Sequence, residues 1–296
     1  MTGFYVPPFP ARSFRQVLKL SDNVPLQFRR WLEPWFLLEV FLLFNLGFLA
    51  LDILLAHSTN SFREWAEYIP LYFSACAPVI LLIGLVFVDR RRIVWKILGN
   101  AVGWISILIG LVGVLYHLNS SFFEERTLKS LTYSAPFAAP LAYTGLGFLL
   151  LLNRMVDANS MEWPKWVLFM AVGGYAGNFV FSLMDHAGNG FFNPAEWVPV
   201  IAGALAIGFL VMPLLVKVSR GFLTLCVVLL LLEAAIGVWG FVLHASANLR
   251  GPSLRAFDNF VYGAPPFAPL LFPNLVALGL LALWRLWQFV PTTHHD

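Results

Sequence analysis

The sequence predicts an all-α integral membrane protein with eight transmembrane helices, arranged as two four-helix bundles that repeat one another in parallel. Three observations lead to this fold class. Hydrophobic residues make up 59% of the 296 residues and charged residues only 12%, which is about half the charge of a soluble domain. The apolar residues are concentrated in continuous runs about as long as a helix that crosses a bilayer, roughly 20 residues. Several residues of the first half of the sequence also recur in the second half at a nearly constant number of positions.

Eight apolar runs are candidate spans. Because the runs are continuous and do not alternate with polar residues, they predict helices and exclude a β-barrel. The runs cover residues 33–56, 70–88, 97–116, 136–152, 166–185, 198–216, 222–243 and 267–286. The expected organisation is an N-terminal segment (1–30), a first four-helix repeat (31–156), a second four-helix repeat (157–288) and a tail (289–296).

The distribution of Lys and Arg predicts how the chain sits in the bilayer. Fourteen of the 19 Lys and Arg residues fall in segments on one side and five on the other. By the positive-inside rule, both termini are expected in the cytoplasm, across a bacterial plasma membrane. Residues 13–30 are expected to form a short amphipathic helix on the membrane surface. A net charge of +3, without a basic stripe, argues against nucleic-acid binding.

An internal repeat relates the two halves. Two histidine pairs carry it: His57 and His186 are 129 positions apart, and His117 and His244 are 127 apart. The aromatic residues that precede the even-numbered spans repeat with an offset of 129, as Tyr68 with Trp197 and Tyr133 with Tyr262. Since each half holds four spans, the halves are expected to be related by an axis along the membrane normal.

Four histidines are expected at the outer face, where the odd-numbered spans end. They are His57, His117, His186 and His244. In one interpretation they stabilise helix ends, because a histidine suits the negative end of the helix dipole and the last carbonyls. In the other, neutral imidazole is a metal ligand, a haem ligand or a proton carrier. No Cys, Met or carboxylate motif at short spacing indicates a metal site.

A quinone site would combine these histidines with the neighbouring aromatic and proline-rich segments. Tyr133 and Tyr262 open segments rich in Ala and Pro, at 133–140 and 262–269. Proline interrupts a helix, and irregular backbone at membrane depth is tolerated where it lines a cavity. We therefore expect quinone or haem b as cofactor; without a ligand, each segment is simply a kinked helix start. The expected binding residues are His186, His244, Tyr262, His57, His117 and Tyr133.

Ionisable residues inside the spans are functional candidates, because each costs about 2.5–3.5 kcal/mol at the bilayer centre. Glu233 is flanked by apolar residues, and helical periodicity places it on the same face as His244, about 16 Å away along the axis. We expect Glu233 to act in proton transfer; the alternative is a hydrogen-bonded structural residue. Its counterpart at an offset of 129 is Trp104. Glu39 is expected to reach the cytoplasmic membrane surface.

The architecture resembles that of membrane subunits of the polysulfide-reductase type, which have eight spans in two four-helix bundles, cytoplasmic termini and a quinol site near the outer face. The resemblance covers topology and length over most of the chain. With the histidines, it implies a membrane subunit of an electron-transfer assembly, whose metals and soluble redox centres belong to periplasmic or membrane partner subunits. Two other functions stay open: a transporter or channel for a small solute, ion or metal, and a structural anchor for a periplasmic partner.

Overall fold

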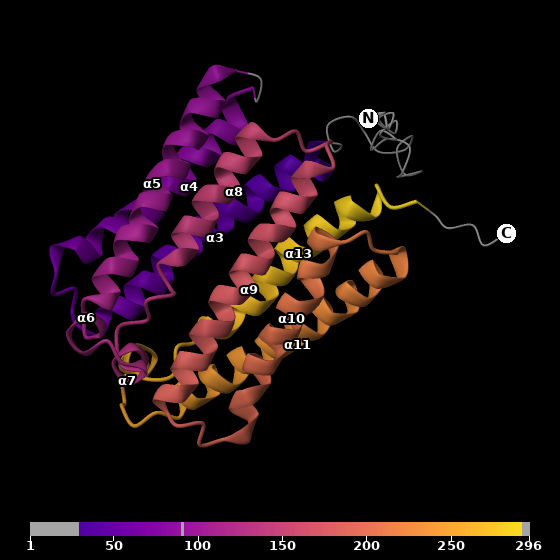
Figure 1. The fold of residues 1–296 in the computed structure, drawn as a ribbon. Coiled ribbons are helices and arrows are strands. Elements are labelled where there is room, and N and C mark those ends of the chain that lie inside the picture. Colours follow the sequence, from indigo (N-terminus) through magenta and orange to yellow (C-terminus); the bar gives the residue numbers. More distant parts are fainter. Residues whose placement is uncertain (1–29, 90–91, 292–296) are drawn as a thin grey trace.

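The computed structural model describes residues 30–89 and 92–291, and within these ranges the chain forms helices and no strand (Figure 1). The all-α prediction is confirmed. The expected amphipathic segment before residue 30 and residues 292–296 of the tail lie outside the described residues. Several short helices complete the fold: η1 (Arg30–Leu32), α6 (Phe122–Glu125), α7 (Leu128–Thr132) and α12 (Ala256–Tyr262).

Seven helical segments in the described ranges are long and apolar enough to cross a bilayer. The chain is therefore a multi-pass helical membrane protein. The seven are α3 (Pro34–Ser58), η2 with α4 (Trp65–Glu67 and Tyr68–Phe87), α5 (Ile93–Leu118), α9 (Glu162–Gly188), η3 with α10 (Pro194–Glu196 and Trp197–Leu215), α11 (Arg220–Leu249) and η4 with α13 (Ala268–Leu270 and Leu271–Trp287).

The fourth predicted span is shorter than expected. Helix α8 (Leu141–Met155) has 15 residues, which is about 22 Å against a hydrocarbon core of about 30 Å. It begins five residues after the predicted start, because Pro136 and Pro140 lie in a run of turns where a continuing helix would need backbone N–H donors. Whether α8 and its lead-in together form an eighth span stays a prediction.

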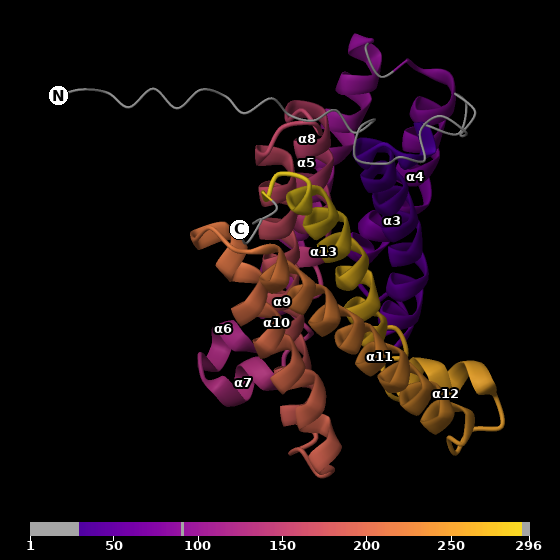
Figure 2. The same cartoon turned by 90° about the vertical axis from the view of Figure 1, so that its right-hand side faces the viewer.

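The long helices pack as two groups with the same pattern of neighbours (Figures 1 and 2). In the first group, α4 packs on α3 and α5, and α8 packs on α5 and α3. In the second, α10 packs on α9 and α11, and α13 packs on α11 and α9. Helices α3 and α5 are thus diagonal across the first bundle, as are α9 and α11 across the second. The bundles meet where α8 packs on α9 and α13 packs on α3.

The two ends of the molecule differ in their polar residues. Helices α3, α5, α9 and α11 all point their C-terminal parts to the end that carries α6, α7 and α12 (Figures 1 and 2). We call this the histidine end. The opposite end, where α8 and α13 finish with Arg154 and Arg285 in their last turns, is the arginine end. Large apolar side chains such as Phe44, Trp104 and Trp239 are exposed on the outer faces of the bundles, as expected where lipid is the solvent.

The expectation that Glu39 reaches the membrane surface is wrong. Its side chain is fully buried, and its carboxylate accepts 2.6 Å hydrogen bonds from Nη1 and Nη2 of Arg154. Asn153 Nδ2 donates to the same carboxylate at 2.8 Å. The guanidinium carbon of Arg154 lies 3.4 Å from the ring centroid of Trp95. A buried bidentate ion pair therefore ties α3 to α8 at the arginine end.

Close helix packing recurs in both bundles through glycine. Gly110 of α5 lies against Pro140 and Thr144, and Gly237 of α11 lies against Pro269. The glycines are 127 positions apart and the prolines 129, which are the two offsets of the sequence repeat. A side chain larger than hydrogen at these positions would separate each helix from the segment that begins its neighbour.

Replacing Gly110 with Leu is expected to lower the free energy of unfolding by about 3 kcal/mol, at the upper end of overpacking costs. A Cβ at this position would lie 2.6 Å from the backbone nitrogen of Thr144 and 2.8 Å from the carbonyl oxygen of Pro140, and backbone atoms cannot rotate away. Gly145→Leu is the matched control, since apart from its chain neighbours and its own helix backbone no described atom lies within 4 Å of its Cβ position. Thermal unfolding in mild detergent measures the difference; equal midpoints for the two variants would contradict it.

Candidate functional site at the histidine end

The four histidines form one pair in each bundle. His57 on α3 and His117 on α5 face one another across the first bundle, with ring centroids 6.2 Å apart. In the second bundle, Asp185 lies close enough to His186 and His244 to interact electrostatically with both. Among the described residues, no group of three or more His, Cys, Asp or Glu side chains could hold a metal ion.

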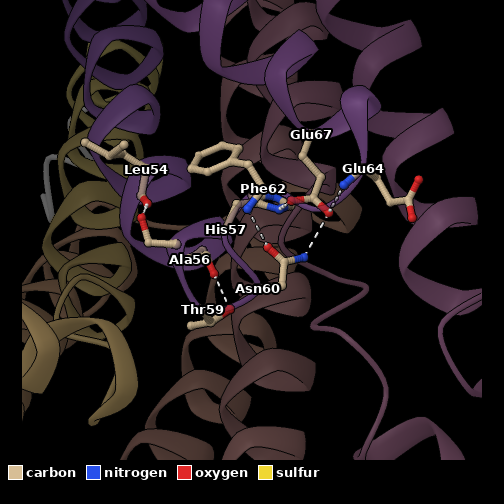
Figure 3. Close-up of polar contacts among 9 residues, drawn as sticks. Leu54, Ala56, His57, Thr59, Asn60, Phe62, Glu64 and Glu67 are labelled. Atoms are coloured by element: carbon tan, nitrogen blue, oxygen red, sulfur yellow. Dashed lines mark hydrogen bonds and ion pairs between the residues drawn. The ribbon is translucent and has the colours of Figure 1, made fainter.

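The loop after α3 folds back so that His57 meets a carboxylate (Figure 3). Nδ1 of His57 lies 3.0 Å from Oε2 of Glu67, and Asn60 Nδ2 donates to Oε1 of Glu67 at 2.8 Å. Phe62 makes the reversal, with φ of 52° and its N–H donating to the His57 carbonyl at 3.0 Å. Because a carboxylate only accepts hydrogen bonds, Nδ1 of His57 carries the proton in this contact.

The loop after α9 repeats this arrangement. Nδ1 of His186 lies 3.7 Å from Oε2 of Glu196, a longer contact than that of the first half. Phe191 has φ of 50°, and its N–H donates to the His186 carbonyl at 3.1 Å. Its ring stacks on Trp197 with centroids 4.0 Å apart. Each half therefore builds a histidine–glutamate pair from equivalent residues.

The other two histidines fasten the proline-rich segments. Nδ1 of His117 lies 2.9 Å from the Pro136 carbonyl oxygen, and Nδ1 of His244 lies 2.8 Å from that of Pro265. A carbonyl oxygen can only accept, so Nδ1 is the donor in both contacts. In the neutral ring, Nε2 then holds a lone pair and is free to accept a hydrogen bond or bind a metal.

These contacts differ from the expected helix caps. The ring nitrogens of all four histidines contact groups in the segment that follows the helix, not the last carbonyls of the helix itself. Three of the histidines do lie in the last turn of their helices. His244 does not, because α11 continues to Leu249. The histidines therefore hold loops against the bundle.

Tyr133 and Tyr262 lie at equivalent positions on the rim. Tyr133 follows α7 and Tyr262 ends α12, and their exposed fractions are 65% and 70%. Neither makes a hydrogen bond or ring contact with a histidine in the described part of the chain. With Trp65, also exposed, they match the aromatic belt that marks a membrane interface.

Glu233 lies inside the second bundle with an exposed fraction of 1%. Residues at equivalent places in α5 and α11 are 127 positions apart. The counterpart of Glu233 in the first bundle is therefore the buried Ser106 and not Trp104, which is 61% exposed. Ser106 Oγ donates to the Tyr143 carbonyl at 2.7 Å. Oε2 of Glu233 has no hydrogen-bond partner among the described residues. The second bundle thus carries a carboxyl where the first has a satisfied hydroxyl.

Neither a scan of protein-family models nor searches of curated proteins and of solved structures found a match to this chain. The fold defines the class, a multi-pass helical membrane protein. The particular function has to be inferred from the chemistry of the histidine end and of Glu233.

Proposed function

We propose that this protein is the membrane subunit of an electron-transfer assembly and that it binds a quinone at the histidine end, taken as the outer face. One observation carries the proposal. Nδ1 of His57, His117 and His244 makes a hydrogen bond to an acceptor of the following segment at 2.8–3.0 Å, whereas Nδ1 of His186 lies 3.7 Å from Glu196. In the neutral form, the rings of these three histidines therefore present Nε2 as a hydrogen-bond acceptor.

This tautomer suits the oxidation of a quinol. A quinol hydroxyl donates a hydrogen bond to Nε2, and the imidazole takes the proton as the quinol loses its electrons to a redox centre of the partner subunit. Glu67 stabilises the imidazolium that forms on His57, in the manner of the carboxylate in a catalytic triad. The quinone, two protons and two electrons leave separately. His186 with Glu196 provides the equivalent arrangement in the second half.

Haem b is the alternative occupant. A ligating histidine commonly donates its second ring nitrogen to a carboxylate or a carbonyl, as His57 and His117 do. Their rings lie 6.2 Å apart, on diagonal helices, so they are the residues that would hold such a group. Bound haem would supply one-electron transfer at that position.

The proposal includes the finer architecture. The chain has eight spans if residues 134–140 and α8 together cross the bilayer. The two halves have matching helix neighbours and matching histidine contacts, which supports a parallel repeat. Two membrane repeats divided near residue 157, cytoplasmic termini and a bacterial plasma membrane belong to the same proposal. So does the resemblance to membrane subunits of the polysulfide-reductase type, with periplasmic or membrane redox subunits as partners.

Transport of an ion or small solute is the second candidate. It is favoured by buried polar atoms of Tyr175 and Asn178 without protein partners inside the second bundle. Against it, fully buried apolar side chains (Leu168, Ala171, Leu223, Cys226 and Leu230) lie on the arginine side of these groups, which favours an internal path that opens only at the histidine end over a channel through the bundle.

Extraction of the full chain in mild detergent tests the proposal. We expect a near-stoichiometric quinone by mass spectrometry, or a haem Soret band in the optical spectrum. A colourless, quinone-free protein that also fails to bind added quinone would contradict the electron-transfer role and leave transport or anchoring.

A further inference from the structure

The interior of the second bundle holds polar atoms that find no partner in the chain. They are Tyr175 Oη, Asn178 Oδ1 and Nδ2, and Glu233 Oε2, all without hydrogen bonds in the described ranges. The three side chains are at most 4% exposed. A buried polar atom left unsatisfied costs about 1–3 kcal/mol, and native proteins satisfy nearly all of them through protein groups or ordered water. These atoms therefore need hydrogen-bond partners from outside the chain.

The unpartnered groups belong to a continuous row. Tyr175, Asn178, Ser182 and Asp185 follow one another on one face of α9, three or four positions apart. The rise between neighbours is about 5–6 Å, a gap that one water molecule bridges with two hydrogen bonds of about 2.8 Å. Glu233 faces this row from α11, close enough to Tyr175 for electrostatic interaction. We call these five residues the polar lane.

The polar lane leads to the histidine end. Asp185, its last member, interacts electrostatically with His186 and His244. Ser182, one turn further in, is nine-tenths buried. The lane therefore connects Glu233, in the middle of α11, with the end of the bundle where the histidines lie.

The other direction is closed by apolar side chains. On the arginine side of Tyr175 and Glu233, α9 and α11 bring together five side chains with no exposed surface: Leu168, Ala171, Leu223, Cys226 and Leu230. Helix α10 has no titratable residue. The one on α13, Arg285, lies in its last turn at the arginine end and donates to the Ala158 carbonyl. No charged group of the described chain faces Glu233 from that side.

The first bundle is different at the equivalent positions. The residues 129 positions before the lane members of α9 are all apolar: Leu46, Leu49, Ile53 and Ala56. The counterpart of Glu233, Ser106, is bonded to Tyr143, whose hydroxyl in turn bonds Ser74 and donates to the Pro70 carbonyl at 3.0 Å. The first bundle has polar groups of its own, such as Asp52 near His57 and the unpartnered Thr144 Oγ1, but its α3 lacks the continuous polar row that α9 carries.

We propose that the polar lane is a water-filled proton path that opens at the histidine end and terminates at Glu233. The proton leaves the Glu233 carboxyl, passes along waters held by Asn178 and Ser182, and reaches Asp185 and His244 at the opening; no electron moves. This develops the role in proton transfer that the sequence predicts for Glu233, and it does not depend on quinone binding by the histidines.

Hydrogen–deuterium exchange of the Glu233 carboxyl tests the path. In the full chain in lipid nanodiscs, infrared spectra recorded over a range of pH identify the protonated-carboxyl band that Glu233→Gln removes. On transfer to D2O, this band is expected to shift within the mixing time. In Asn178→Leu/Ser182→Ile, which installs the residues of the first bundle, the shift is expected to be at least about tenfold slower, since apolar side chains hold no water chain.

Asn45→Leu is the matched control, because it removes another buried asparagine, at the contact of α3 with Asn274 of α13, and leaves the lane intact. Its exchange should match the wild type. Three results would overturn the proposal: no carboxyl band assigned to Glu233 at any pH, wild-type exchange as slow as in the double variant, or a double variant that exchanges as fast as the wild type. The last would mean that the proton enters by another route. None of these results depends on whether the protein binds a quinone, because quinone binding is measured in a separate experiment.

Discussion

Replacing Arg154 with Leu is expected to lower the free energy of unfolding by about 3–5 kcal/mol, because it leaves an uncompensated charge in the protein interior. The charge is that of Glu39, which is fully buried and receives two 2.6 Å hydrogen bonds from the guanidinium. The neighbouring Asn153 amide cannot replace a cation. Leu also loses the stacking of the guanidinium on Trp95.

A double variant separates the effect of the unpaired charge on stability from the effect of the lost side-chain packing. Glu39→Leu/Arg154→Leu leaves no buried charge and is expected to recover most of the stability lost in the single variant, as found for buried ion pairs replaced by apolar residues. Lys165→Leu, an exposed basic residue at the same end, is the control and should change little. Unfolding midpoints in mild detergent measure all three. A single variant as stable as the control would show that the ion pair does not hold α3 against α8.

Removing the first histidine pair is expected to weaken the binding of a quinol analogue by roughly five- to 150-fold. His57→Ala/His117→Ala deletes two Nε2 acceptors, each worth about 0.5–1.5 kcal/mol net as a hydrogen bond, and about 1.4 kcal/mol corresponds to a factor of ten in affinity. Glu67→Gln is expected to keep binding and to lower turnover in the assembly, because a neutral amide cannot stabilise the imidazolium.

The control for these variants is Glu124→Gln, which removes an exposed carboxylate at the same end without touching a histidine. Equilibrium binding to the full chain in nanodiscs gives the affinities. Equal affinity for the wild type and the double variant would exclude the first pair as the site and leave the pair of the second bundle to be tested in the same way.

The helices could be predicted from the sequence because their signals are local. Apolar runs, histidine spacing and proline-rich segments all lie within one element or recur at a fixed offset, and seven of the eight predicted spans appear as helical segments of sufficient length. The start of α8 was misplaced because its two prolines were included in the span. The pairing of Glu39 with Arg154 could not be predicted, since these residues are 115 positions apart and only the packing of α3 on α8 joins them.

The candidate site was predicted in part. The histidines were expected together at one end, but not their partners, although a glutamate ten positions after the histidine recurs in both halves as Glu67 and Glu196. The polar face of α9 was also missed, and its signal was the spacing of Tyr175, Asn178 and Ser182 along one helical face. A single offset of 129 pairs Glu233 with Trp104, whereas equivalent residues of α5 and α11 are 127 positions apart and pair it with Ser106.

Photoaffinity labelling with a quinone analogue tests the central claim most directly. The full chain in nanodiscs is labelled, digested and analysed by mass spectrometry, with and without an excess of unlabelled quinone. We expect saturable labelling of the loops that follow α3 and α5 or those that follow α9 and α11, and its loss when the corresponding histidine pair is replaced by alanine. Labelling that excess quinone does not reduce, spread over lipid-facing residues such as Phe44 and Trp104, would contradict a quinone site at the histidine end.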